Sequence, residues 1–137
     1  MTAAARRFVT ICNGLALLVA VWFVARAGST SILGPARTDD LPYGDLLRLN
    51  RSSAVVYSVL AVAGLAAGLS GRRPVALVVG ALWGVLGAVA FLVVATGSDT
   101  LGLTRPGDSA AALALALCTA VPAVAGLDER AAGPAAG

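Results

Sequence analysis

The chain has 137 residues, of which 58% are hydrophobic and 12% are charged, and its formal net charge at pH 7 is +3. With a mean hydropathy of +0.88, this balance excludes an ordinary soluble globular domain and indicates a membrane protein. The length suits one membrane domain, residues 1–137, and is too short for a transport domain joined to a soluble catalytic domain.

The basic residues are all arginines, and the chain has no histidine. They stand singly or in pairs between apolar runs, whereas a nucleic-acid-binding face needs clustered basic residues beside polar or aromatic ones. We therefore expect no nucleic-acid partner. The exclusive use of arginine and the abundant alanine are typical of GC-rich codon usage, which suggests an actinobacterial origin.

Four apolar stretches are each close to the roughly 20 residues that a helix needs to cross a hydrocarbon core. They cover about 8–25, 52–70, 75–95 and 110–127. Because the backbone in lipid must satisfy its own hydrogen bonds, such runs form helices. The sequence therefore predicts an all-α integral membrane four-helix bundle, with outer loops at about 26–51 and 96–109 and a short cytoplasmic turn at 71–74.

The first stretch, residues 8–25, has two interpretations. Arg6 and Arg7 before an apolar run, followed by Ala25-Arg26-Ala27, also describe a signal peptide with a small-residue cleavage site. The apolar core is longer than the roughly 7 to 15 residues of a signal peptide. We therefore expect the stretch to be retained as the first helix.

Asn13 is the strongest polar side chain within this stretch. An amide in a membrane helix seeks a hydrogen-bond partner across a helix interface. The hydroxyls of Thr10, on the same helix, and of Thr119, in the fourth stretch, are the candidates. We interpret Asn13 as a link between helices and not as a ligand site.

The two outer loops show a similarity that predicts an internal repeat. Residues 28–39 read GSTSILGPARTD and residues 97–108 read GSDTLGLTRPGD, an offset of 69 positions. Two helical hairpins in the same orientation, a parallel duplication, would give this pattern. In the first half the extra segment 40–51, DLPYGDLLRLNR, forms either a short helix at the membrane interface or an outward extension of the second helix.

With this helix spacing, Asn50 lies ahead of the second helix, and Leu101-Gly102-Leu103 followed by Asp108 lies ahead of the fourth. In these features the chain resembles a family of small actinobacterial four-helix membrane proteins of unknown function. That family has histidines where this chain has Ser53 and Ala112, so no histidine role carries over. The resemblance implies the architecture and no activity.

Tyr57 lies about two turns inside the second helix, and it is a candidate for the edge of a small pocket open to the outer face. Further along, Gly64 and Gly68 in the second helix and Gly80 and Gly84 in the third are spaced four apart. Small residues at this spacing let helix backbones approach in lipid. Because so short a turn joins the two helices, we expect them to pack against each other through these glycines, with a dimer interface as the alternative.

Arg72 and Arg73 are predicted to hold this turn at the aqueous surface, while Pro74 begins the next helix, where its missing N–H costs nothing. The arginines divide equally between the two sides of the membrane. Since the pairs 6–7 and 72–73 crowd short segments beside helix ends, we expect both termini to be cytoplasmic in a plasma-membrane protein.

The fourth stretch contains Pro122, which interrupts the helix and frees a carbonyl, so that it either bends the helix or lines a cavity. Cys12 and Cys118 are single cysteines in different helices. Without a Cys-x-x-Cys spacing or a nearby carboxylate, we interpret them as packing residues and not as metal ligands.

These features favour a non-enzymatic protein without catalytic, cofactor-binding or metal-binding residues. No charged residue lies within the spans, where such a residue would mark an ion path, and the usual haem ligands are missing. The predicted function is an accessory or structural subunit that contacts another membrane protein or a second copy in the lipid bilayer. The alternative is a small carrier, or a bundle that binds lipid or another apolar ligand between the repeats.

Overall fold

The computed structural model describes residues 1–26, 51–96 and 106–131, and the description of side chains is narrower at the helix ends. Within these ranges the chain forms four helices and no strand: α1 (Ala3–Arg26), α2 (Arg51–Ser70), α3 (Arg73–Thr96) and α4 (Pro106–Ala131). The predicted all-α four-helix bundle is confirmed. Residues 28–39, the segment 40–50 with Asn50, and residues 97–105 lie outside the described residues, while 106–108 of the second predicted loop already belong to α4.

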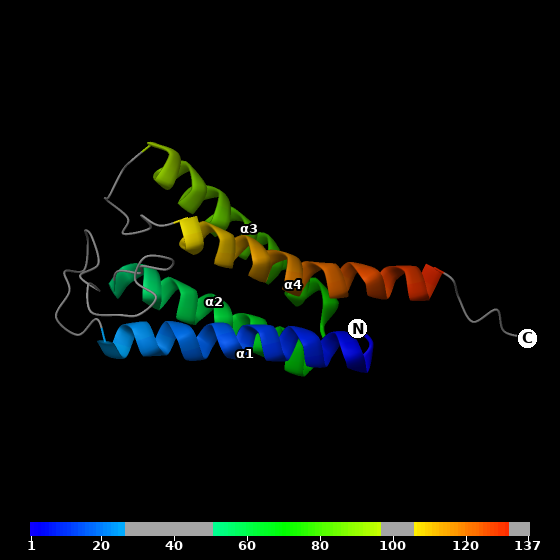
Figure 1. Cartoon of the computed structure of the whole chain (residues 1–137). Helices are drawn as coiled ribbons and strands as arrows, with labels where there is room; N and C mark the ends of the chain where they lie inside the picture. The colour runs from blue at the N-terminus through cyan, green and yellow to red at the C-terminus, as the bar shows by residue number, and fades with distance from the viewer. Residues whose placement is uncertain (27–50, 97–105, 132–137) are drawn as a thin grey trace, which may run out of the picture.

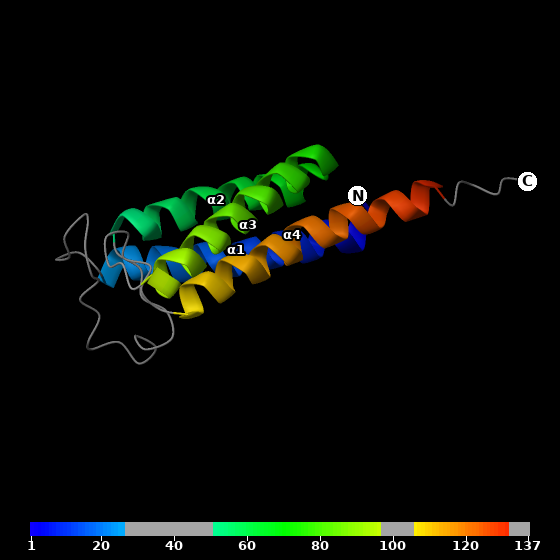
Figure 2. The ribbon, with the colours of Figure 1, turned by 90° about the horizontal axis from the view of Figure 1, so that it is seen from above.

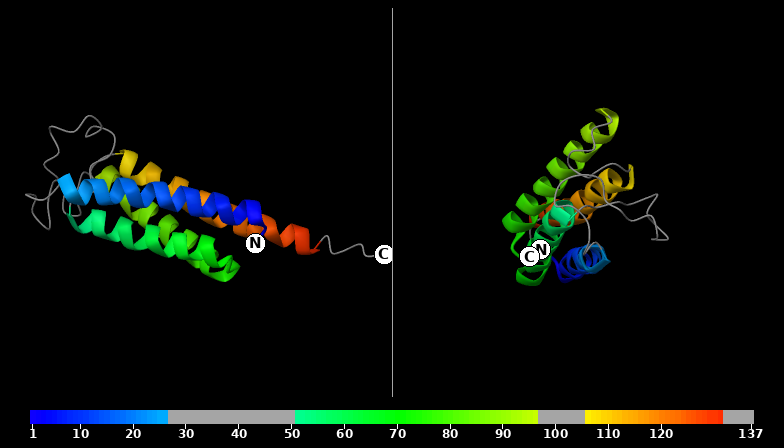
Figure 3. Two further views of the ribbon diagram at one scale, coloured as in Figure 1. Left: turned by 90° about the horizontal axis from the view of Figure 1, so that it is seen from below. Right: turned by 90° about the vertical axis from the view of Figure 1, so that its left-hand side faces the viewer.

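Successive helices run in opposite directions, so that α1 and α3 point one way and α2 and α4 the other (Figure 1). The main contacts are between α1 and α2 and between α3 and α4, while α1–α4 and α2–α3 contacts are less extensive. Figures 2 and 3 show the two pairs from above, from below and from one end. The fold is therefore two antiparallel hairpins in the same orientation, as the repeat predicts, with the start of α1 and the end of α4 at one end.

Three helices are long and apolar enough to cross a membrane, over Ala3–Phe23, Ser53–Ser70 and Arg73–Thr96. The apolar part of α4 that the structure describes, Ser109–Ala125, is shorter than these, although α4 itself continues to Ala131. Large aliphatic side chains are exposed on the outer faces of all four helices. A surface of this kind suits lipid, and the chain is a helical membrane protein.

The expected packing of the second helix against the third through these glycines is wrong. Gly64 of α2 faces Asn13 of α1, and Gly80 of α3 faces Ala120 of α4. The short turn fixes only the neighbouring ends of α2 and α3, and the two helices diverge from there (Figure 1). The close backbone approaches lie within each hairpin instead, where a glycine of one helix faces a small or hydrogen-bonded residue of its partner helix.

Three of the four predicted packing glycines sit where a side chain would collide. A Cβ atom at Gly68 would lie 2.9 Å from the backbone nitrogen of Thr10, and one at Gly80 would lie 3.1 Å from that of Ala120. At Gly64 it would meet the amide of Asn13. Gly84 differs, because a Cβ there would make an ordinary contact at 3.8 Å with the Cβ of Ala116.

The turn between α2 and α3 is shorter than predicted. Gly71 has a φ of 65°, a left-handed conformation that glycine adopts without strain, and its N–H donates to the carbonyl of Ala67 across 3.0 Å. Helix α3 then begins at Arg73, so Pro74 lies in its first turn and not at its first position. A proline is tolerated there because the first N–H groups of a helix have no partner within it.

Candidate functional site

A polar cluster is buried at the centre of the bundle. Asn13, Trp83 and Thr119 are fully buried. The Nδ2 group of Asn13 donates to the Val9 carbonyl at 2.9 Å and to Thr119 Oγ1 at 3.1 Å. The indole N–H of Trp83 donates to Asn13 Oδ1 at 3.3 Å. One amide therefore links α1, α3 and α4.

The remaining helix, α2, leaves room for the Asn13 side chain of this cluster. Gly64 of α2 lies directly against the Asn13 amide, and any side chain at position 64 would overlap it. All four helices thus meet around Asn13. Of the two partners considered from the sequence, Thr119 is the one across the interface, whereas Thr10 donates to the Arg6 carbonyl of its own helix at 2.8 Å.

Sequence reasoning missed Trp83 and Gly64 as neighbours of Asn13. A signal for Trp83 was present, since a buried indole N–H usually finds an acceptor, and few side-chain acceptors lie within the spans. Gly64 was recognised as a packing residue but assigned to the wrong neighbour. Its position opposite an amide depends on how α1 and α2 are rotated, which spacing along one helix does not determine.

Tyr57 extends the cluster toward the side of the bundle. Its ring meets that of Trp83 edge to face, with centroids 5.1 Å apart, and its side chain is buried. It also contributes to the wall of an open groove of about 320 Å³ between α1 and α4, together with Cys12 and Leu115. Tyr57 therefore lines a pocket, and the lining of that pocket is mostly apolar.

Cys12 and Cys118 lie near each other, a proximity that the sequence did not predict. Both are free thiols, half-buried, and they lie near each other across the α1–α4 contact. They come directly before Asn13 and Thr119, whose side chains are hydrogen-bonded across the same contact. Pro122 lies one turn further along α4, which continues through it as one helix.

The seam between the two hairpins contains an apolar groove of about 390 Å³, here called the valine groove. It separates α2 from α3 on the side where these helices diverge. Its lining is aliphatic throughout: Val55, Val56, Val59, Leu60, Leu82, Val85, Leu86 and Val89.

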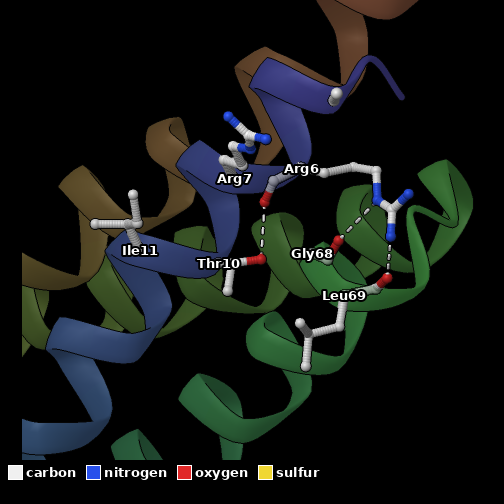
Figure 4. Close-up of a pocket in the computed structure, with 7 residues that line it drawn as sticks. Arg6, Arg7, Thr10, Ile11, Gly68 and Leu69 are labelled. Atoms are coloured by element: carbon white, nitrogen blue, oxygen red, sulfur yellow. Dashed lines mark hydrogen bonds between the residues drawn. The ribbon is translucent and has the colours of Figure 1, made fainter.

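A third groove, of about 420 Å³, lies between the start of α1 and the end of α2. Figure 4 shows Arg6 reaching across to α2 while Arg7 points away from it. The Nε of Arg6 donates to the Gly68 carbonyl at 3.3 Å, and its Nη2 donates to the Leu69 carbonyl. We call this the arginine groove; its lining comprises Ala3, Arg6, Arg7, Thr10, Ile11, Gly68 and Leu69.

The predicted turn arginines lie beside this groove. Arg72 is exposed, and Arg73 is half-buried, with an Nε atom that has no hydrogen-bond partner among the described residues. A Cβ atom at Gly71 would touch the Arg6 side chain, which therefore covers the turn. Arg6, Arg7, Arg72 and Arg73 together place four cations at this end of the bundle.

Among the described residues, no group of three or more histidine, cysteine, aspartate or glutamate side chains is placed to hold a metal ion. No protein-family model, curated protein or solved structure matches this chain. The resemblance to actinobacterial four-helix proteins stays a prediction.

Proposed function

We propose that the protein is a non-enzymatic accessory subunit of the plasma membrane, and that its valine groove receives an apolar helix of another membrane protein. The polar side chains of the central cluster support a structural role, because Trp83 and Thr119 are both hydrogen-bonded to Asn13. In this arrangement they hold the two hairpins together and leave recognition to the outer surface.

The observation that carries the proposal is the contrast between the helix contacts. Within each hairpin, glycines bring the backbones together. Between α2 and α3, large aliphatic side chains line an open seam, and Val59 and Val85 on its two sides are 61% and 63% exposed. Helix association in lipid depends on van der Waals packing, and a helix in this seam would pack against both hairpins at once.

A lipid-binding bundle is the second candidate, and it is favoured by the composition of the same groove. Its lining offers no side-chain polar group that would select a protein partner. An acyl chain would therefore fill it without leaving an unsatisfied group. This version of the proposal needs no partner protein.

We also propose that both ends of the chain face the cytoplasm. The described part of the chain places the start of α1 and the turn after α2 at the same end of the bundle (Figure 1), and both carry paired arginines. Arginines close to the ends of membrane helices favour the cytoplasmic side.

Photo-crosslinking in native membranes tests the proposed function. A photoreactive residue replaces Val59 or Val85 in the groove, and a matched control replaces Leu117, which is 64% exposed on α4. We expect one adduct of defined protein mass from both groove positions, absent from the control and lost when Val56→Trp fills the groove. Adducts to lipid alone from the groove would favour the second candidate, and equal protein adducts from all three positions would contradict a specific surface.

A further inference from the structure

We propose that the α1 edge of the arginine groove binds the phosphate of an anionic phospholipid, with Arg7 as its main ligand and an acyl chain lying along the outer face of α1. This site is separate from the valine groove, and the inference does not depend on the proposed accessory function. Three observations support it. Arg6 is bonded to α2 whereas the adjacent Arg7 is exposed, an apolar stripe continues from them along α1, and further arginines lie at this end of the bundle.

Arg6 neutralises the negative end of α2 beside the site. Its guanidinium donates to the carbonyls of Gly68 and Leu69 in the last turn of α2, where the helix dipole is negative. Those carbonyl groups would otherwise repel an anion at this point. A guanidinium has five N–H donors, so these two bonds leave others for a ligand.

Arg7 is the group that is available. Its side chain is exposed and points away from α2 (Figure 4), and it makes no hydrogen bond or ion pair with another described residue. A guanidinium offers paired N–H groups that match two oxygens of a phosphate. Arg7 can therefore bind an anion without giving up a contact that the fold uses.

The surface below Arg7 explains why the phosphate would belong to a lipid. Residues four or three apart lie on one face of a helix. Ile11, Leu15 and Leu18 follow Arg7 at this spacing, and all three are highly exposed. They form an apolar stripe that runs from the arginine groove along the membrane-spanning part of α1, where an acyl chain attached to the bound phosphate would lie. A free phosphate ion would make no use of it.

The surrounding charge favours the same ligand. Arg72 and Arg73 lie just beyond Gly71, against which the Arg6 side chain packs, and they add two cations beside the groove. Asp128, Glu129 and Arg130 near the end of α4 have side chains outside the described part. Basic pockets between membrane helices on the cytoplasmic side are suited to anionic lipid headgroups.

Thermal unfolding of the full chain in a neutral detergent tests the site. The probes are dioleoyl phosphatidylglycerol, dioleoyl phosphatidylcholine and inorganic phosphate, titrated separately. We expect phosphatidylglycerol to raise the melting temperature in a saturable way and the other two to have little effect. An equal rise with phosphatidylcholine or with inorganic phosphate would overturn the proposal.

Two substitutions and a matched control locate the effect. Arg7→Gln should raise the phosphatidylglycerol concentration at half effect by about fivefold, the value for one arginine near an anionic surface. Arg7→Lys should keep most of the affinity, which distinguishes a lost ligand from a misfolded protein. Arg72→Gln removes an exposed charge beside the groove that does not line it, and should raise this concentration clearly less than Arg7→Gln does. Equal losses in Arg7→Gln and Arg72→Gln would show general surface attraction and reject the site.

Discussion

The indole N–H of Trp83 in α3 donates a hydrogen bond to the amide oxygen of Asn13 in α1, and the two residues are 70 positions apart in the chain. Two further buried pairs on these helices have the same separation: Val9 with Val79, and Ala20 with Ala90. Three of the four buried residues described in α1 therefore have a buried counterpart in α3 at this offset. This offset is one residue longer than the 69 of the loop similarity that predicts the repeat, and the hydrogen bond joins two residues that correspond to each other at this offset.

The hydrogen bond between Asn13 and Thr119 should be measurable as a coupling between the hairpins. We expect a double-mutant cycle with Asn13→Ala and Thr119→Val to give a coupling of about 0.6 to 1.7 kcal/mol, the range for hydrogen bonds between membrane helices. Unfolding in mixed micelles with increasing SDS provides the free energies. Ser58→Ala is the control, since its hydroxyl donates to the Ala54 carbonyl of its own helix. A coupling near zero would mean that the cluster does not join the helices.

The glycines should differ in their tolerance of a methyl group. Gly68→Ala should cost roughly 1 to 3 kcal/mol, because its Cβ would lie 2.9 Å from the backbone nitrogen of Thr10, and an overpacked backbone contact must move apart. Gly84→Ala should be nearly neutral, because its Cβ has ordinary contacts. The same unfolding assay compares the two. If Gly84→Ala were the more damaging, α3 would not be packed on α4 as described.

The two cysteines should form an intramolecular disulfide when the membrane is treated with iodine, a two-electron oxidant that enters lipid. Each thiol loses a proton and the sulfurs form one bond, while iodine is reduced to two iodide ions. We expect both cysteines to resist a mass-adding maleimide after denaturation and to react again after reduction. In the Cys12→Ser variant, Cys118 has no second cysteine in the chain to pair with. It should therefore still react with the maleimide after iodine treatment. Only disulfide-linked dimers in the wild type would contradict the α1–α4 contact.

Orientation can be measured with single cysteines in the Cys12→Ser, Cys118→Ser background. Ser70 and Thr96 are exposed and lie at opposite ends of the bundle. An impermeant maleimide added to intact cells should label a cysteine at position 96 and not one at position 70, while permeabilised cells should label both. The reverse pattern in intact cells would place the basic end outside and would exclude cytoplasmic termini.

The sequence by itself determined that the chain is a helical membrane protein with four helices, because long apolar runs in lipid can satisfy their backbone only as helices. It also identified Asn13 as a residue that must find a partner, because an amide in lipid is costly without one. The sequence also predicted where the helices begin and end to within a few residues. For example, α3 begins at Arg73 and not at Val75.

Only the tertiary structure decided which helices pack together. Glycine spacing shows that a helix can be approached closely, but not by which neighbour, and Gly64 and Gly80 meet α1 and α4 instead of each other's helices. In a soluble protein, a polar outer face would have indicated how each helix is rotated. Here lipid-facing and buried positions are both apolar, so the pattern carries little information about rotation. The adjacency of Cys12 to Cys118, and of Trp83 to Asn13, depends on those rotations and appears only when all four helices are assembled.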